Sequence, residues 1–277
     1  MSLMSHQSAS PEHQAKPVAA DAPELSVIVP TYREAQNLPV LVPRVFDALR
    51  EAQVSGEMVI VDDDSGDDTE SVVAELAQRF DVRLIVRTDE RGLSSAVLRG
   101  FEAARGAVML VMDADLSHPP ERVPAVAEPL RANRADFAIG SRYVAGGRTQ
   151  DWGQDRKLNS LLATWLSRPL TTARDPMAGF FCLRRETWRQ AAPLNPIGYK
   201  IGLELIVKCG CRRVEEVPII FTDRLHGESK LTNKQRTEYL RQLVGLYRFR
   251  FPWLIPAVIG VGLLLAYVLL ARPSLIR

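Results

Sequence analysis

The strongest constraint on the fold of this chain is a regular alternation of short β-branched runs with longer stretches of helical periodicity, beginning near residue 25. Such an alternation is typical of crossover units that build a largely parallel sheet with helices on both faces. The runs expected to be strands are 26–30, 57–61, 82–86, 107–112 and 137–139. The segments expected to be helices are 37–51, 69–79, 92–104 and 121–131. Because ligands of such sheets bind where strands end, we expect the chemistry in the loops that follow the strands.

Composition narrows the class of protein. The chain has 277 residues with 35 basic and 33 acidic side chains, and this near balance gives no reason to expect a nucleic-acid partner. Its three cysteines lack the spacing of a zinc site and the density of a disulfide scaffold, so we interpret them as core or surface thiols in a reducing compartment. The length accommodates one large α/β domain and a small appendage.

The two ends of the chain differ in composition from its middle. Residues 1–23 are rich in Ala, Ser, Pro and His without an apolar run, which predicts a disordered tail. Residues 253–271 carry no charge and are long enough to cross a hydrocarbon core of about 30 Å, so we expect one transmembrane helix before a short tail, 272–277. A buried core helix is the alternative. Gly260 and Gly262 would offer small packing surface for a homo-oligomer of such helices.

The charges around the apolar segment indicate an orientation. Lysine and arginine are more frequent before it than after it, which places the main domain, expected over 24–235, on the cytoplasmic face of a membrane. Between the two, residues 236–252 combine apolar side chains near helical spacing with arginines. Two interpretations are open for this region: an interfacial helix lying in the lipid headgroup layer, or an amphipathic helix packed on the domain.

Acidic residues follow the first two expected strands. Glu34 follows the first strand, and Asp62 and Asp64 follow the second. Carboxylates at strand ends can accept hydrogen bonds from a ribose or a base edge, so these three are candidates for nucleotide binding. An alternative for the first loop is a helix-capping box between Thr31 and Glu34. The acids and hydroxyl expected to stabilise the start of the next helix are Asp67, Asp68 and Thr69.

Asp113 and Asp115, at the end of the fourth expected strand, are the sharpest signal in the chain. Two carboxylates two residues apart at the tip of a buried apolar strand repel each other unless a cation or hydrogen-bond donors offset the repulsion. Hard oxygen ligands with few protein contacts suit Mg²⁺ or Mn²⁺, which would keep the rest of its shell for water and a diphosphate. We therefore expect a divalent-metal site here.

Several motifs occur in a characteristic order along the chain. They are SVIVPTYRE (26–34), VIVDDDSGDDT (59–69), GLSSAVLRGFEAARG (92–106), DADLSHPPE (113–121), GSRYVAGG (140–147), DPMAGFF (175–181), GYKIGLELIVK (198–208) and RLHGESKL (224–231). With them, most of the chain resembles the family-two inverting glycosyltransferases of the GT-A fold, and in particular the branch of dolichol-phosphate or polyprenol-phosphate mannose synthases. The resemblance implies the nucleotide-diphospho-sugar transferase architecture, a mixed, mainly parallel sheet with helices on both faces. The charge-free segment 253–271 adds the expected C-terminal transmembrane helix.

The resemblance also implies an activity: transfer of mannose from GDP-mannose to a polyprenyl or dolichyl phosphate, with a lipid bilayer and Mg²⁺ or Mn²⁺ as partners. The residues it assigns to the nucleoside are Pro30, Tyr32, Glu34 and Asp64, with Asp62 a further substrate-binding candidate. Those it assigns to the sugar diphosphate are Asp113 and Ala114. Those it assigns to the metal are Asp113, Asp115 and Ser117, the last in a position where the better-known members carry Gln. Those for the acceptor phosphate are Arg142 and Arg156, and those of a loop closing over the donor are Arg224, Ser229 and Lys230.

This chemistry needs no dedicated base. The acceptor phosphate is an anion near neutral pH and can attack the anomeric carbon directly, so orientation matters more than proton removal. His118 and His226 are therefore expected in contact or structural roles. The residues expected to take part in catalysis are Asp115, Arg142, Arg156 and Asp175. Two interpretations of Asp175 are open: it orders a sugar hydroxyl or the arginines, or it turns the chain before Pro176.

Other functions are also compatible with parts of the pattern. Transfer of glucose from UDP-glucose to the same acceptor is the nearest alternative, because sugars that differ in one hydroxyl are distinguished by site geometry. An aspartate-nucleophile phosphatase would also place paired aspartates after a buried strand, but on its first strand. A non-catalytic membrane scaffold is disfavoured by the intact set of acids and arginines.

Overall fold

The computed structural model describes residues 22–150, 154–198, 200–222 and 233–253 together with Gly260 and Tyr267; the side chains of 154–160 and 233–236 are not described. The strands of its main sheet are β1 (Leu25–Thr31), β2 (Gly56–Asp62), β3 (Val82–Val86), β4 (Val108–Val111), β5 (Phe137–Ser141), β7 (Phe181–Arg184) and β8 (Val214–Pro218). A small second sheet pairs β6 (Arg148–Thr149) with β9 (Ile220–Phe221). The helices are α1 (Leu38–Glu51), α2 (Thr69–Leu76), α3 (Leu93–Ala103), η1 (Pro120–Arg122), α4 (Val123–Arg131), α5 (Gln154–Ser167), α6 (Arg185–Arg189), α7 (Ile201–Lys208) and α8 (Asn233–Arg250).

The order of strands in the main sheet is β3-β2-β1-β4-β7-β5-β8. Pairing is parallel between β3, β2, β1 and β4 and between β5 and β8, whereas β7 is antiparallel to both β4 and β5. Strands β1, β2, β4 and β5 therefore run in the same direction, and their carboxyl ends lie at one edge. The predicted α/β class with a mixed, mainly parallel sheet is confirmed, and each of the five expected strands is present within two residues of its predicted ends.

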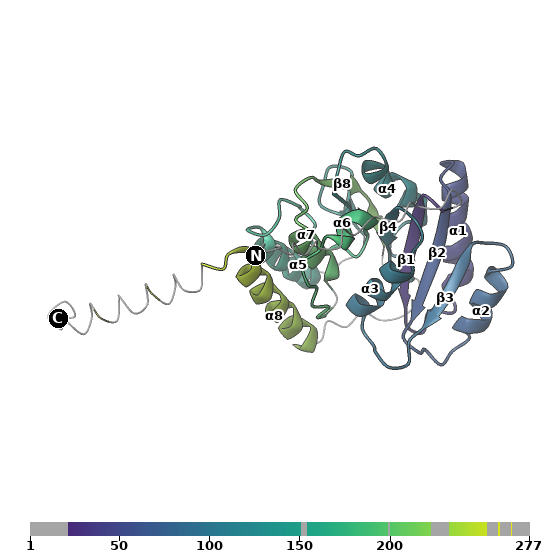
Figure 1. Ribbon diagram of the computed structural model, residues 1–277, viewed down its shortest axis with the longest axis horizontal. Coiled ribbons are helices and arrows are strands. Elements are labelled where there is room, and N and C mark those ends of the chain that lie inside the picture. The colour runs from purple at the N-terminus through teal and green to yellow at the C-terminus, as the bar shows by residue number, and fades with distance from the viewer. Residues whose placement is uncertain are drawn as a thin grey trace, which may run out of the picture.

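Helices cover both faces of the sheet (Figure 1). Val27 and Val29 of β1 face the cluster that includes α1, α2 and α4, while Ile28 between them faces the cluster that includes α3 and α7. Successive side chains of a strand point to opposite faces, so a strand buried on both sides is apolar at every position. This explains why the strand signals in the sequence are continuous apolar runs.

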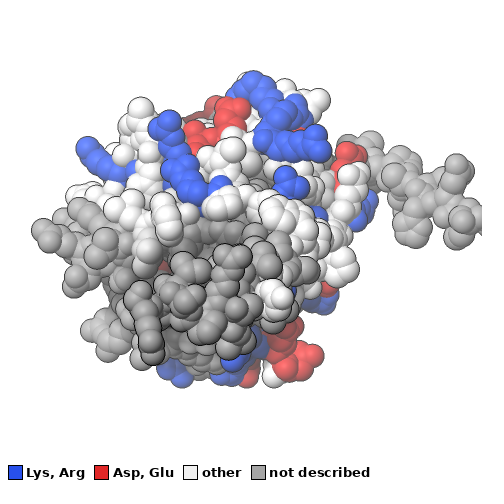
Figure 2. Space-filling model, turned by 90° about the vertical axis from the view of Figure 1, so that its left-hand side faces the viewer, with Lys and Arg blue, Asp and Glu red and all other residues white. Residues whose placement is uncertain are grey.

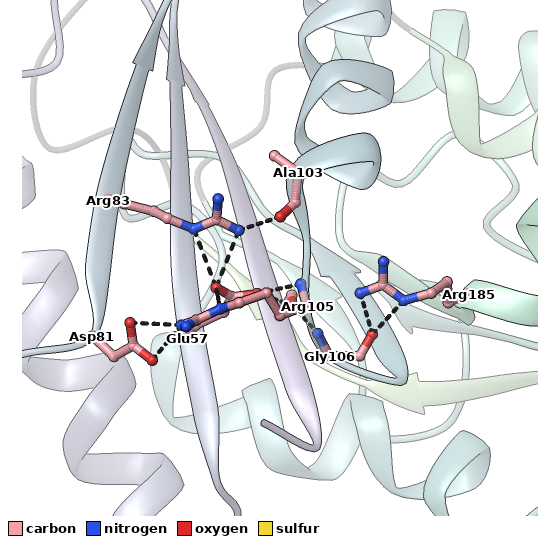
Figure 3. A network of polar contacts seen from close by, with 8 residues as sticks. Glu57, Asp81, Arg83, Ala103, Arg105, Gly106 and Arg185 are labelled. Carbon is pink, nitrogen blue, oxygen red and sulfur yellow. Dashed lines mark hydrogen bonds and ion pairs between the residues drawn. The ribbon is translucent and has the colours of Figure 1, made fainter. Parts of the chain in front are cut away.

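The amino ends of β1, β2 and β3 are joined by the buried carboxylate of Glu57 in β2 (Figure 3). Its Oε1 accepts hydrogen bonds from Ser26 Oγ at 2.6 Å and from the Arg105 backbone N–H at 2.5 Å. Its Oε2 accepts from Arg105 Nε at 2.8 Å and from Arg83 Nε at 3.2 Å. Burial acts to raise the pKa of Glu57, but the hydrogen bonds from Ser26 and Arg105 and the charge of Arg83 outweigh it and lower the pKa. Glu57 thus connects β1, β3 and the loop before β4.

Helix α8 packs on the domain along one face. Leu243 and Leu246 are buried in a cluster with residues of α7. The hydroxyls of Tyr239 and Tyr247 donate to the carbonyl oxygens of Ala163 and Leu166 in α5, each at 2.8 Å. On this face α8 is packed on the domain, as one of the two interpretations of 236–252 has it. Apolar side chains on its other face are exposed: Leu240, Val244 and Phe249.

The expected transmembrane segment, 253–271, lies outside the described residues except for Trp253, Gly260 and Tyr267. Among the helices that are described, none has the length and the apolar character needed to cross a membrane. The predicted tail over 1–23 likewise lies outside them, apart from its last two residues.

We predict that Glu57→Gln destabilises the domain by about 1.5–3 kcal/mol, because hydrogen bonds to a charged, buried acceptor are lost. The pKa of Glu57 is lower in the folded protein than its ordinary value of 4.5, so its stabilisation is complete above that value and is lost as the pH falls through the folded pKa. Urea unfolding of wild type and variant should therefore show a difference in the free energy of unfolding that shrinks in acid.

The matched control is Glu121→Gln, which removes an exposed carboxylate paired with Arg44 at 2.7 Å. An exposed pair of this kind contributes under about 1 kcal/mol. Equal losses of stability in the two variants would show that Glu57 is not the connection described above.

Candidate active site

The predicted site residues lie at the carboxyl edge of the sheet, on the loops after β1, β2, β4 and β5. Parallel pairing places Thr31 beside Asp62, and Ile28 beside Val111 two residues before Asp113. Strand β5 ends at Ser141, so Arg142 follows at the same edge. Residues as far apart in the sequence as Tyr32 and Arg142, about 110 positions, are brought to one edge of the sheet in this way.

Asp62 connects the first two loops. Its carboxylate accepts hydrogen bonds from Thr31 Oγ1 at 2.8 Å, from the Ser65 N–H at 2.8 Å and from Ser65 Oγ at 2.6 Å. Ser65 Oγ in turn accepts from the Arg33 N–H at 2.8 Å. Asp62 is buried, and its contacts make it a support of the loops rather than an exposed acceptor.

The capping box considered for Thr31 and Glu34 does not form, because the Thr31 hydroxyl is bonded to Asp62. Helix α1 begins later, at Leu38, and Glu34 Oε2 accepts a hydrogen bond from the Asn37 side-chain amide at 2.5 Å. In the second loop, Asp67 Oδ1 accepts from the Thr69 N–H at 3.1 Å and from its hydroxyl at 2.6 Å, which confirms that Asp67 stabilises the start of α2.

Tyr32 projects from the first loop and is flanked by two guanidinium groups. The carbons of the Arg33 and Arg91 guanidinium groups lie 5.3 and 5.6 Å from its ring centre. Arg91 also donates to Asp64 Oδ2 at 3.3 Å. Tyr32 is 46% exposed, so one exposed aromatic ring, two cations and a carboxylate form a polar platform. Sequence reasoning missed Arg91, although its position in the loop after the third parallel strand is a signal that could have found it.

A buried ion pair supports the loop that carries Arg91. Arg87 Nε donates to Asp63 Oδ1 at 2.9 Å, and Asp63 Oδ2 accepts from the Gly92 N–H at 2.7 Å. Both side chains are nearly enclosed. Neither residue was expected in the site. Together they fix the ends of the loop between β3 and α3.

Three residues at this edge have left-handed backbone conformations without being glycine: Arg33 (φ 62°), Asp64 (φ 53°) and Leu116 (φ 61°). Each lies in the loop after a different strand, β1, β2 or β4. Such conformations cost free energy and persist only where the surrounding contacts over-determine them, which happens most often at functional sites. Backbone strain therefore marks the same edge as the polar residues.

Asp113 and Asp115 occupy the turn after β4. The Asp113 side chain is 32% exposed, whereas Asp115 is buried. Asp115 Oδ1 accepts from the Ser117 N–H at 3.1 Å and from Ser117 Oγ at 2.6 Å, so Ser117 supports Asp115 in this arrangement. Ala114 between the two acids is buried.

The donor set of this turn fits a divalent ion. Two carboxylates supply hard oxygen ligands, which divalent ions such as Mg²⁺ prefer. Among the residues described here, no group of three or more His, Cys, Asp or Glu side chains able to hold a metal occurs. Gly179 faces Asp113, and a Cβ atom there would lie 3.3 Å from Asp113 Oδ2, so the absence of a side chain keeps this space open. An ion held by two carboxylates would retain positions for phosphate oxygens and water.

Arg142 is held by Asp175. Asp175 Oδ2 accepts from the Arg142 N–H at 3.0 Å and from its Nε at 2.8 Å, and Oδ1 accepts from Nη2 at 2.7 Å. Asp175 is fully buried, and its own N–H donates to Glu216 at 2.9 Å. Of the two interpretations of Asp175, the structure supports the one in which it orders an arginine.

This pair keeps the arginine charged. Burial opposes the charge on Arg142 most strongly, but the hydrogen bonds and the negative charge of Asp175 outweigh it and raise the pKa of Arg142. The guanidinium also lies 5.4 Å from the ring centre of Phe221 in β9. A fixed, permanently charged guanidinium is suited to bind a phosphate.

His118 closes the turn of the paired acids and is enclosed by protein. Burial lowers the pKa of His118 as the dominant effect, against the charges of Asp113 and Asp115, which raise it. The imidazole is therefore neutral at neutral pH. This agrees with the expectation of a contact or structural role.

Some predicted site residues cannot be placed. Arg156 lies in α5, but its side chain belongs to the part that is not described. The predicted closing loop falls outside the described residues, with Arg224, His226, Ser229 and Lys230.

Comparison with known proteins identifies relatives of this chain. The family described as Glycosyl transferase family 2 matches residues 26–187. Proteins named dolichol-phosphate mannosyltransferase from Pyrococcus furiosus, Mycosarcoma maydis and Saccharomyces cerevisiae are 46%, 46% and 45% identical over 82%, 84% and 82% of this chain. The chain spans 64% of the length of the Pyrococcus relative, and 82% and 88% of the two fungal relatives.

Solved structures share the fold at low sequence identity. Mannosyl-3-phosphoglycerate synthase from Rubrobacter xylanophilus has a TM-score of 0.63 at 20% identity, covering 84% of this chain and 76% of that one. Glucosyl-3-phosphoglycerate synthase from Mycobacterium tuberculosis, in complex with Mn²⁺, UDP-glucose and phosphoglyceric acid, has a TM-score of 0.59 at 19% identity, covering 88% and 85%. These likenesses confirm the predicted GT-A architecture.

A double-mutant cycle tests the pair of Arg142 and Asp175. Each single variant, Arg142→Met or Asp175→Asn, leaves a buried group without its partner and should destabilise by about 3–5 kcal/mol. The double variant should cost well under the sum, because no uncompensated charge remains. Chemical unfolding of the four proteins measures the coupling.

The same cycle on the exposed pair of Arg99 and Glu102, 3.1 Å apart on α3, is the control and should give a coupling under about 1 kcal/mol. Additive losses at Arg142 and Asp175 would contradict the role assigned to Asp175.

Proposed function

The chain belongs to glycosyl transferase family 2 and is a glycosyltransferase, and on this premise we propose that it transfers mannose from GDP-mannose to a polyprenyl phosphate such as dolichyl phosphate. The observation that carries the proposal is the position of a paired-acid turn and a carboxylate-held arginine at one sheet edge. A sugar diphosphate and a phosphate acceptor require these two kinds of group side by side. The names of the relatives support mannose and dolichyl phosphate.

The loops after β1, β2 and β3 are assigned to the guanosine end of the donor. Tyr32 offers an exposed ring between two guanidinium groups, and Asp64 lies beside it as a hydrogen-bond acceptor. Pro30 and Glu34 flank this platform. Asp62 acts through Thr31 and Ser65, whose positions it fixes.

A divalent ion, Mg²⁺ or Mn²⁺, would be held by Asp113 and Asp115 and would stabilise the charge that develops on the departing diphosphate. Ser117 holds Asp115 in place through two hydrogen bonds. Ala114 forms the buried backbone between the two acids. These residues orient the donor so that its anomeric carbon faces the acceptor.

The acceptor phosphate is assigned to Arg142, which Asp175 orients, with Arg156 as a second cation. A phosphate oxygen of the acceptor forms a bond to the anomeric carbon while the bond from that carbon to the diphosphate oxygen breaks. GDP leaves with the electron pair, and the configuration at the carbon inverts. No proton is transferred, so the site needs orientation and electrostatic stabilisation rather than a base. Arg224, Ser229 and Lys230 are assigned to the donor phosphates.

Membrane association is assigned to the end of the molecule formed by α5 and α8, at the opposite end from α1 and α2 (Figure 1). Their apolar side chains Leu161, Leu162, Trp165, Leu240 and Val244 are each at least 50% exposed. In Figure 2, viewed toward this end, the described residues form an uncharged band with lysine and arginine gathered along its upper margin and acidic side chains among them. Such a face suits the headgroup layer of a bilayer. The catalytic domain would lie on the cytoplasmic face, anchored by one span over 253–271.

The activity is tested by transfer of labelled mannose from GDP-mannose to a short-chain polyprenyl phosphate, with and without Mg²⁺ or Mn²⁺. We expect metal-dependent mannolipid, and a decrease of at least about a hundredfold in kcat for Asp115→Ala, because a metal ligand that acts on the leaving group is lost. Asp47→Asn, an exposed carboxylate on α1, is the control and should leave the rate unchanged.

UDP-glucose is run as the competing donor. If only UDP-glucose gives a lipid product, the proposed mechanism stands and the transferred sugar is glucose instead of mannose. No lipid product from either donor would contradict the polyprenyl-phosphate acceptor.

The membrane face is tested with the double variant Trp165→Ser, Val244→Ser in the full chain. Loss of two apolar contacts should raise the KM for an acceptor embedded in vesicles about tenfold, whereas the KM for a short acceptor in solution stays the same. Val40→Ser, which removes a 41% exposed apolar side chain from α1, is the control and should change neither constant. Parallel changes for both acceptors would contradict a membrane role for this face.

A further inference from the structure

His118 lies at the carboxyl edge of the sheet, in contact with Asp113, and has no assigned role in the transfer reaction. It is 2% exposed and lies between two aromatic rings. Phe180 stacks on it with ring centres 5.2 Å apart, and Phe221 meets it edge-on at 5.4 Å. The imidazole is therefore locked in position by packing.

The polar contact of His118 closes the turn that carries both acids. The Asp113 backbone N–H donates to His118 Nδ1 at 3.1 Å. An imidazole nitrogen can accept a hydrogen bond only when it carries no proton, so the ring is in the tautomer protonated at Nε2. The contact joins the first residue of the turn to its last and encloses Leu116, whose backbone is in the left-handed region (φ 61°).

The other end of the turn is held independently. The Thr222 N–H donates to the carbonyl oxygen of Ser117 at 3.2 Å, and its hydroxyl donates to that of Leu116 at 3.4 Å. Ser117 holds Asp115 through its hydroxyl at 2.6 Å. Asp115 is thus supported by Ser117 and Thr222, whereas the backbone of Asp113 depends on His118.

We propose that His118 is a positioning residue that sets the direction of the Asp113 carboxylate, a role that rests on the proposed function of this carboxylate at the metal and diphosphate. Asp113 Oδ2 lies 3.8 Å from His118 Nδ1. A Cβ atom at Gly179 would come within 3.4 Å of both Asp113 Oδ1 and His118 Cε1, so the carboxylate, the imidazole and Gly179 enclose one narrow space. A displaced imidazole would release the Asp113 backbone and turn its carboxylate away from the ion.

Two substitutions separate this role from simple packing. In His118→Asn, the side-chain oxygen can take the place of Nδ1 and accept the Asp113 N–H. In His118→Phe, the ring can still stack between Phe180 and Phe221, but the acceptor is gone. A residue that acts only by packing would be replaced better by Phe, and one that acts through the hydrogen bond would be replaced better by Asn.

The first measurement is binding of Mn²⁺ to the full chain in detergent, alone and with GDP or UDP, followed by electron paramagnetic resonance. We expect His118→Phe to weaken Mn²⁺ binding about ten- to hundredfold, as is typical when a group that orients a metal ligand is lost. His118→Asn should recover most of the loss. Because no acceptor or sugar is present, this result does not depend on the identity of the lipid or of the sugar.

The second measurement divides the kinetic effect. The metal concentration for half-maximal rate and the KM for the sugar nucleotide should rise in His118→Phe, while the KM for the acceptor phosphate stays as in the wild type. Thermal unfolding of each variant shows how far a change in stability accompanies the change in binding. Gly179→Ala, which crowds the same carboxylate, should weaken Mn²⁺ binding in the same direction.

Each outcome decides the role of His118. If His118→Phe binds Mn²⁺ as wild type does, or if Asn and Phe weaken binding equally, His118 is a packing residue and the proposal is wrong. A wild-type chain that binds no Mn²⁺ with or without nucleotide would overturn both this role and the metal site. If the wild-type chain binds Mn²⁺ normally but makes no mannolipid, the proposed acceptor or sugar is wrong. The role of His118 is then still decided by the Mn²⁺ binding of its two variants.

Discussion

Parallel hydrogen bonding of β1 with β2 on one side and β4 on the other is the constraint on which the rest of the structure depends. It makes three loops leave the sheet in the same direction, and β5, which is parallel to them two strands away, adds a fourth. No single loop contains a complete site: the first carries Tyr32, the second Asp64, the third the paired acids and the fourth Arg142. The register of the strands assembles these parts, because a shift by one residue would reverse the face on which every side chain of a strand lies.

The charged side chains at the two edges of this sheet have different surroundings. At the amino edge, the buried carboxylate of Glu57 is fully matched by donors from Ser26, Arg83 and Arg105, so the charges there stabilise the fold. At the carboxyl edge, Asp113 is partly exposed and the polar platform around Tyr32 faces solvent. Charges that are matched inside the protein hold the strands together, and charges left facing outward are available to a ligand.

Within the carboxyl edge, the groups assigned to the reaction are supported by groups that do not face the substrates. Asp175 orients Arg142, Ser117 supports Asp115, and Asp63 fixes Arg87 and Gly92 beneath the loop of Arg91. The left-handed backbone conformations of Arg33, Asp64 and Leu116 lie at the same edge. A site that aligns two anionic substrates benefits from such preorganisation, since the barrier is lowered by position and field rather than by proton transfer.

The sequence by itself determined five strands of the main sheet, the class of fold and the edge at which the candidate site residues lie, because the hydrophobic period and the acids at strand ends are local patterns. The motifs also predicted Arg142 and the paired acids as site residues.

Only the tertiary structure decided which partners these residues have. Asp175 could be a turn residue or an orienting group until its contact with Arg142, 33 positions away, was seen. Glu57 carries no local signal, since a lone glutamate looks the same whether it meets solvent or a partner from another strand. For Arg91 the one signal was its position in the loop after the third parallel strand, and its contacts with Tyr32 and Asp64 came only from the structure. Two interpretations of 236–252 were open from the sequence, and only the structure shows that one face of α8 packs against α5 and α7. Hydrophobic periodicity is a local property that can be read from the sequence. The pairing of charges between distant segments depends on distances that exist only after the strands have aligned.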